Sequence, residues 1–157
     1  MLKRIICAML CLAALGTCFS ASGESERVFV FCNPETSVNV RRTPQMGADV
    51  SGYLDFGDWV ETDGEKKNGF LHVLGITENG EGWIFAGYVV EDEPIKLENA
   101  RAYIAASGRV MSYRWVAGKK NGWVSNNAEV KVFALSDEWA VTNRGYIRTK
   151  YLEVWHE

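Results

Sequence analysis

The chain has 157 residues, of which 47% are hydrophobic and 12% aromatic, and its formal net charge at pH 7 is −3. Once the signal segment described below is removed, 15 basic and 20 acidic residues remain, a net charge of −5. Such a chain lacks the basic surface that phosphate binding needs, so we expect no nucleic-acid partner.

Residues 1–23 are predicted to be a secretory signal peptide. Lys3 and Arg4 form a short positive region, residues 5–19 are apolar, and small residues at 21–23 offer a cleavage site. The apolar run is shorter than the about 20 residues that a membrane span needs, and no other segment comes close. We therefore expect a secreted or cell-envelope-associated protein, extracellular or periplasmic, with no transmembrane segment in its mature chain.

Only one of the four cysteines, Cys32, lies outside this signal, so no intramolecular disulfide is available. We expect Cys32 to be a small buried core residue, and pairing with another chain is the alternative. Cys18 follows a sequence that loosely resembles a bacterial lipoprotein signal. Because Thr17 fits that signal poorly, a lipid anchor at Cys18 is the less favoured alternative.

The mature chain has the pattern of short β-strands throughout. Its apolar runs, among them residues 28–32 and 38–40, are short and bounded by turn residues. No window shows a helical period with caps, so we expect almost no α-helix. Asn and Gly tolerate the positive φ of hairpin turns, and three Asn-Gly pairs therefore indicate tight turns: residues 68–69, 79–80 and 121–122.

Residues 91–94, Glu-Asp-Glu-Pro, are predicted to separate two domains. Three acids resist burial, and Pro94 cannot pair within a central strand. We expect the first domain over residues 27–93 and the second over residues 98–157.

The second domain is predicted to be a diverged copy of the first. Both have the same order of apolar alternation and Gly-aromatic pairs, and the second has shorter connections. The matching segments are 28–32 with 101–105 and 38–41 with 111–114 at an offset of 73, 52–54 with 122–124 at an offset of 70, and 82–84 with 145–147 at an offset of 63.

The motifs resemble those of bacterial SH3 (SH3b) domains. Residues 38–44, VNVRRTP, resemble the family's "LNVRSGPS" opening, and residues 68–73, NGFLHV, resemble its "ngWykV". Residues 82–89 and 145–152 both resemble its "GWv...YL" ending. The first copy has Arg42-Thr43 where the family usually has Ser-Gly, and the second lacks the Gly-Pro loop.

This resemblance implies an all-β fold of two tandem SH3-like small barrels, each partly open. It also implies binding of bacterial cell-envelope material, commonly peptidoglycan peptides.

We expect no enzyme. For Cys-His chemistry, the mature chain has only Cys32, His72 and His156. Cys32 lies in a predicted strand with no helix N-terminus to lower its pKa, and His72 is expected to face solvent. His156 lies one residue from the C-terminus, where ordering is poor.

We also expect no metal site and no cofactor, because a zinc site needs three or four convergent ligands. An acidic run offers calcium binding as an alternative, but such alternating acids usually form a solvated face. Its members are Asp55, Asp58, Glu61, Asp63 and Glu65.

The aromatic residues are the better candidates for function. In SH3-like barrels the ligand groove lies between two loops, and aromatic faces beside a guanidinium suit peptide or sugar ligands. Trp139 and Phe70 are expected in the core, and for Trp83 and Tyr146 a core or half-buried position is favoured over an exposed one. The ligand-binding candidates are Arg41, Arg42, Asp49, Trp59, Trp83 and Tyr88 in the first copy and Arg114, Trp115, Tyr146 and Tyr151 in the second. Of these, Trp115 is expected to be an exposed loop residue in need of a partner.

The two copies have opposite charge, −7 over residues 27–95 and +4 over residues 96–157. We expect the copies to dock on each other across a short linker. The basic copy facing anionic envelope polymers is the alternative. The sequence thus predicts a non-enzymatic exported protein that recognises cell-wall peptide or glycan. The alternative is a secreted adaptor that binds another exported protein.

Overall fold

The computed structural model describes residues 25–76 and 80–154. The predicted signal peptide, Cys18 and His156 lie outside these residues. Within the described part of the chain, no helix has the length and apolar character required to cross a membrane.

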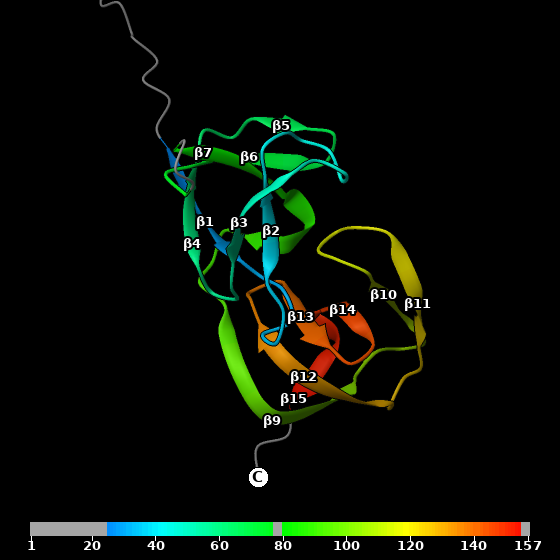
Figure 1. Ribbon diagram of the computed structural model, residues 1–157. Helices are drawn as coiled ribbons and strands as arrows, with labels where there is room; N and C mark the ends of the chain where they lie inside the picture. The colour runs from blue at the N-terminus through cyan, green and yellow to red at the C-terminus, as the bar shows by residue number, and fades with distance from the viewer. Residues whose placement is uncertain (1–24, 77–79, 155–157) are drawn as a thin grey trace, which may run out of the picture.

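The first half of the molecule is an antiparallel sheet (Figure 1). Its strands follow the order β3-β2-β7-β6-β4-β1-β8, and the short β5 pairs with β6. The strands are β1 (Glu26–Val30), β2 (Val38–Arg41), β3 (Val50–Leu54), β4 (Trp59–Thr62), β5 (Lys66–Lys67), β6 (Phe70–Leu74), β7 (Glu81–Phe85) and β8 (Val89–Val90).

The second half is an antiparallel sheet in the order β11-β10-β14-β13-β12-β9-β15. Its long first strand begins at Ile95, three residues before the boundary predicted for the second domain. The strands are β9 (Ile95–Ile104), β10 (Val110–Tyr113), β11 (Lys120–Val124), β12 (Glu129–Leu135), β13 (Trp139–Thr142), β14 (Gly145–Arg148) and β15 (Leu152–Val154).

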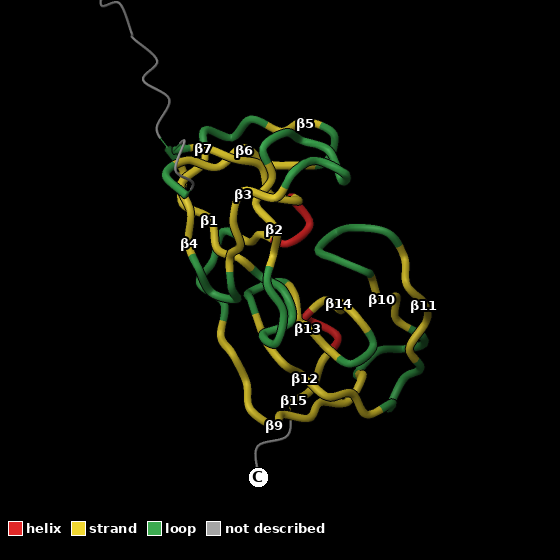
Figure 2. Tube along the Cα trace, viewed as in Figure 1, coloured by secondary structure: helices red, strands yellow, loops and turns green. Residues whose placement is uncertain are grey.

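The two strand orders correspond one to one. In each half a 3₁₀ turn precedes the last strand, η1 (Ala86–Tyr88) in the first and η2 (Thr149–Tyr151) in the second, and these turns are the only helical segments among the described residues (Figure 2). The all-β prediction is therefore confirmed. Neither sheet closes into a full barrel, because the strands at the two ends of each order do not pair with each other.

Pairing registers correct two of the offsets between the halves. Val38 pairs with Leu54, and Val110 pairs with Val124, so Val38 corresponds to Val110 and the offset is 72 rather than 73. Likewise Val28 pairs with Val60 and Ala102 with Val130, which gives an offset of 74. A shift of one residue moves every side chain to the other face of a strand, so Arg41 corresponds to Tyr113, not to Arg114.

The Asn-Gly pairs do not all form the tight turns that the sequence predicts. Asn68 and Gly69 have φ of 52° and 80° and connect β5 to β6, as predicted. The pair at 121–122 instead lies within β11, where the Asn121 amide donates a hydrogen bond to the Arg144 carbonyl, so the turn predicted there is wrong. Asn79 lies outside the described residues.

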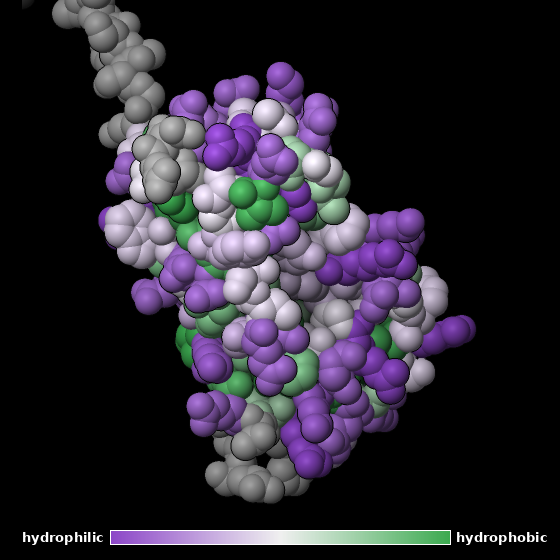
Figure 3. Space-filling view, in the orientation of Figure 1, coloured by the Kyte–Doolittle hydropathy of each residue, from purple (hydrophilic) through white to green (hydrophobic). Residues whose placement is uncertain are grey.

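Each sheet encloses its own apolar core. The first includes Val30, Val40 and Ile84, and the second includes Ile104, Val132 and Ile147. Phe70 and Trp139 are 2% and 4% exposed, so both are core residues as predicted. The view in Figure 3 shows polar residues over most of the visible surface, with apolar residues in small separate groups.

A third apolar cluster joins the two halves. It contains Phe31 and Val90 from the first and Trp139, Val141 and Tyr146 from the second. The Phe31 and Tyr146 rings meet edge to face, with centroids 5.8 Å apart.

The halves are therefore docked, as expected. Their contact is apolar, however, and not made of ion pairs between the acidic first half and the basic second half. No ion pair between described residues joins them. Polar contacts across this boundary are hydrogen bonds, such as Val116 N–H to the Gly87 carbonyl at 3.0 Å and Asp137 N–H to the Asp92 carboxylate at 2.6 Å.

Candidate functional site

Three predicted residues of the first half share one loop. Arg41 ends β2, and its guanidinium donates a hydrogen bond to the Ala48 carbonyl at 2.7 Å. Arg42 N–H donates to the Asp49 carbonyl at 3.0 Å. Arg42 and Asp49 are exposed, whereas Arg41 is half-buried and holds the loop between β2 and β3 in place.

The three aromatic candidates of the first half do not share one surface. Trp59 is 52% exposed on β4, and the Arg27 guanidinium lies 4.2 Å from its ring centroid. Trp83 is half-buried against His72. Tyr88 is half-buried among the rings between the two halves, 6.5 Å from Tyr146 between centroids. No ring contact joins Trp59, Trp83 and Tyr88 to one another among the described residues.

Two candidates of the second half belong to the contact between the halves. Tyr146 is 5% exposed, and its hydroxyl donates a hydrogen bond to the Phe31 carbonyl at 3.1 Å. Burial, reinforced by the nearby Cys32 and Tyr88, raises the Tyr146 pKa far above its ordinary value. A side chain closed off in this way does not meet a ligand, so its assignment to a ligand site is corrected.

Trp115 is half-buried, not exposed as predicted. Its ring meets that of Phe85 edge to face at 5.1 Å, and a Cβ on Gly87 would lie 2.3 Å from its Cδ1. The partner that this indole needs is the first half of the same chain. A ring of this size on a short loop is stabilised when another apolar surface excludes water from it.

The remaining two candidates lie on the second half. Arg114 is exposed, and its N–H donates to the Lys119 carbonyl at 2.9 Å in the loop after β10. Tyr151 is half-buried at the end of η2, with the Lys150 ammonium 5.1 Å from its ring centroid. Of the four predicted ligand-binding residues of the second half, Tyr151 is the one that lines an open groove on that half.

This groove, here called the Trp123 groove, runs between the loop before β10 and the turn η2. Trp123 on β11 is 63% exposed, and it pairs in register with Met111. Three basic and no acidic residues line the groove. Its lining comprises residues 106–111, Tyr113, Trp123, Arg148, Lys150 and Tyr151.

One of the three cations already forms an ion pair. Arg148 forms an ion pair with Glu138, and its guanidinium lies 4.2 Å from the Trp139 ring centroid. Arg109 is exposed and forms no ion pair within the described part of the chain. The groove therefore offers an indole face, a phenol and free positive charge, which together suit a ligand that carries carboxylates.

Trp123 was not among the predicted ligand-binding residues, because Gly122-Trp123 was used only to align the two copies. Alternate residues of a strand point to opposite faces: Val124 is buried, and Trp123 is therefore outside. The equivalent residue of the first half, Tyr53, is 68% exposed. An exposed aromatic residue at the same position of both copies was the signal available in the sequence.

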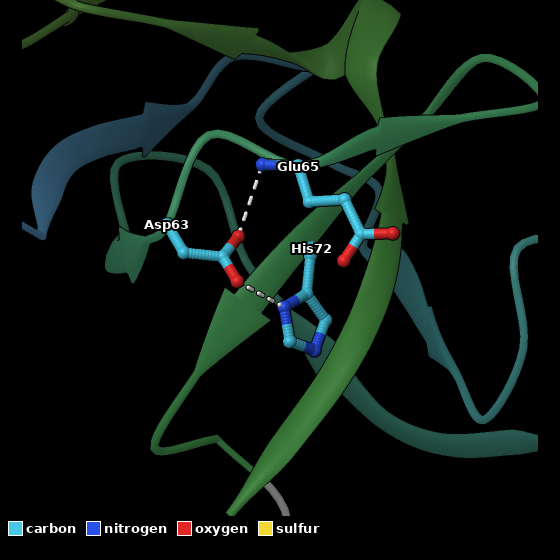
Figure 4. A group of neighbouring side chains, drawn as sticks. All are labelled: Asp63, Glu65 and His72. Carbon is cyan, nitrogen blue, oxygen red and sulfur yellow. Dashed lines mark hydrogen bonds and ion pairs between the residues drawn. The ribbon is translucent and has the colours of Figure 1, made fainter. Parts of the chain in front are cut away.

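A second cluster lies on the first half, around His72 (Figure 4). Contrary to the prediction, the His72 side chain is only 12% exposed. Its ring lies 4.8 Å from the Trp83 ring between centroids, and its Nδ1 donates a hydrogen bond to Asp63 Oδ2 at 2.9 Å. The other nitrogen, Nε2, lies 3.6 Å from Glu81 Oε2.

The turn after β4 brings two acids to this ring. Asp63 Oδ1 accepts a hydrogen bond from Glu65 N–H at 3.0 Å, and His72 N–H donates to the Glu65 carbonyl at 2.9 Å. The Glu65 hydrogen bond, followed by that of His72, lowers the Asp63 pKa. Ligand atoms of Asp63, Glu65 and His72 all lie within 4.8 Å of one another.

The rest of the acidic run is not part of this cluster. Asp55 accepts a hydrogen bond from Ser37 Oγ at 2.7 Å, and Asp58 accepts one from Asp55 N–H at 2.8 Å. Both carboxylates thus shape the turn between β3 and β4. Glu61 is exposed on β4.

Cys32 is 3% exposed and belongs to the first core, as predicted. It lies two residues beyond the end of β1, not inside that strand. Its Sγ donates a hydrogen bond to the Thr36 carbonyl at 3.2 Å, and burial raises its pKa. A thiol that holds its proton in this way is a poor nucleophile.

Comparison with known proteins gives a limited result. No family model matches the chain, and no curated protein matches it. Two solved structures from Trichomonas vaginalis are similar, each 21% identical: NlpC2, over 83% of this chain and 48% of that one, with a TM-score of 0.35, and NlpC1, over 91% and 50%, with a TM-score of 0.37. The chain thus spans about half the length of each.

Proposed function

We propose that this protein is an exported, non-enzymatic binding protein that recognises carboxylate-bearing peptide or glycan of the bacterial cell envelope. The observation that carries the proposal is the Trp123 groove, where an indole that is 63% exposed lies beside Arg109, Lys150 and Tyr151. Trp and Tyr are enriched at binding surfaces, where an apolar ring and a polar group act together.

The chemistry of this groove fits envelope material. Indole and phenol faces stack on sugar rings and on apolar side chains, and cations beside them pair with carboxylates. Peptidoglycan presents both kinds of group. The motifs shared with SH3b domains and the predicted signal peptide agree with this role.

The proposal contains no catalytic step. Cys32 is buried and bonded to the Thr36 carbonyl, and its raised pKa favours the unreactive thiol. His72 is engaged with Asp63. Neither is among the residues that line the Trp123 groove.

Sedimentation of the purified protein with isolated bacterial cell walls, at low and at high salt, tests the proposal. We expect binding at low salt that weakens at high salt, because the cations of the groove are exposed to screening. Protein that stays in the supernatant at both salt concentrations would contradict the proposal. Co-purification of a protein partner without wall binding would instead favour the adaptor alternative.

A further inference from the structure

We propose that Asp63, Glu65 and His72 form a binding site for a transition-metal dication, with Zn²⁺ as the probe. Their ligand atoms lie within 4.8 Å of one another on one turn and one strand (Figure 4). Two carboxylates and an imidazole are a ligand set that zinc uses, with bonds of about 2.0–2.2 Å.

The imidazole is already held in a fixed orientation. Its ring packs against Trp83, and its side chain is 12% exposed. Asp63 in turn is fixed by the Glu65 N–H. Ligands held by their surroundings lose less conformational entropy when a metal binds, which favours affinity.

Charge around the ring favours a cation. Three carboxylates, those of Asp63, Glu65 and Glu81, lie near one imidazole. No lysine or arginine among the described residues forms an ion pair with Asp63 or Glu65. A dication would take the place of the Nδ1 proton between Asp63 and His72, and the neutral imidazole would then carry its proton on Nε2, which lies 3.6 Å from Glu81 Oε2.

Closing the site requires only small movements. Ligand atoms of a tetrahedral zinc ion lie about 3.5 Å apart, so carboxylates now within 4.8 Å must approach by about 1 Å. The exposed Glu65 side chain can make this movement by a change of rotamer, while Asp63 stays in place. Ca²⁺ fits less well, since it takes six to eight oxygen ligands.

Titration of Zn²⁺ into the purified, untagged and EDTA-treated protein, followed by calorimetry, tests this site. We expect one site whose affinity falls at least about tenfold in Glu65→Gln and in His72→Gln. Glu65→Gln is the decisive variant, because the Glu65 carboxylate forms no hydrogen bond or ion pair with another described residue. The metal-free variant should therefore unfold at the same temperature as the wild type. Glu61→Gln, an exposed acid on the neighbouring β4, and His156→Gln should bind as the wild type does.

Absence of zinc binding by the wild type would overturn the proposal, as would equal affinity in Glu65→Gln. Loss of binding in His156→Gln would also overturn it, because the metal would then be held elsewhere. Since the cluster shares no residue with the Trp123 groove, wall binding by the Glu65→Gln variant should be unchanged.

Discussion

The hydroxyl of Tyr146 donates a hydrogen bond to the main-chain carbonyl of Phe31, 3.1 Å away and 115 residues earlier in the chain. The two rings also meet edge to face. This one pair therefore links the two sheets through both a hydrogen bond and an aromatic contact, at a point where both side chains are buried.

Tyr146→Phe should lower the free energy of unfolding by about 1–2 kcal/mol, because it leaves a buried acceptor unsatisfied. Urea unfolding followed by tryptophan fluorescence measures this change. Tyr103→Phe is the matched control, since its hydroxyl bonds to the exposed Glu129 within the second half, and its effect should stay below about 0.5 kcal/mol. Equal effects of the two substitutions would contradict the linking role of Tyr146.

The fold should lose stability in alkaline solution through the same residue. Burial raises the pKa of Tyr146, so the unfolded chain releases this proton near pH 10 while the native state retains it. The contribution of the protonated Tyr146 to the free energy of unfolding is then fully present below pH 10. Above pH 10 the free energy of unfolding falls by about 1.4 kcal/mol per pH unit. Unfolding free energies between pH 8 and 11 should decline less steeply in Tyr146→Phe than in the wild type, and parallel curves would refute this explanation.

Trp115 should matter for stability before it matters for ligand binding. Trp115→Ala removes a half-buried ring from the contact with Phe85 and should cost about 2–3 kcal/mol. Gly87→Ala should cost about 1–3 kcal/mol, because its Cβ would overlap the indole. Gly47→Ala, in open space, is the control and should be nearly neutral. A Trp115→Ala variant as stable as the wild type would place this ring outside the docking contact.

The Cys32 thiol should be unreactive in the native protein. Burial raises its pKa and closes access to reagents, so iodoacetamide at pH 8 should label it slowly until denaturant is added. Mass spectrometry of the labelled protein gives the rate. Rapid labelling of the native state would indicate an accessible thiolate and would reopen the question of Cys-His chemistry.

Local patterns sufficed for the strands but not for their registers. The apolar alternation of residues 38–41 and the Gly-aromatic pairs located corresponding strands in both halves. Their registers were wrong by one residue at β1 and β2, because alternation alone does not say which neighbour a strand pairs with. The pairing partners decide it: Leu54 and Val124 for β2, and Val60 and Val130 for β1.

Contacts between distant segments account for the remaining differences. Tyr146 and Trp115 were assigned to a ligand surface because nothing in their own segments shows that Phe31 and Gly87 cover them. His72 looked solvent-facing because its immediate neighbours in the strand at residues 70–73, Leu71 and Val73, are apolar. Its ring is nonetheless largely buried by Trp83 on β7 and by the turn that carries Asp63. Each of these contacts joins residues whose proximity depends on the finished fold.

Binding to isolated cell walls by Trp123→Ala, compared with Trp59→Ala, tests the central claim most directly. Both residues are exposed tryptophans, 63% and 52%, but only Trp123 lines the groove. Loss of a stacking aromatic face should weaken wall binding about tenfold or more in Trp123→Ala, with an unchanged melting temperature, and leave Trp59→Ala like the wild type. Equal wall binding by Trp123→Ala and the wild type would contradict the proposed ligand site.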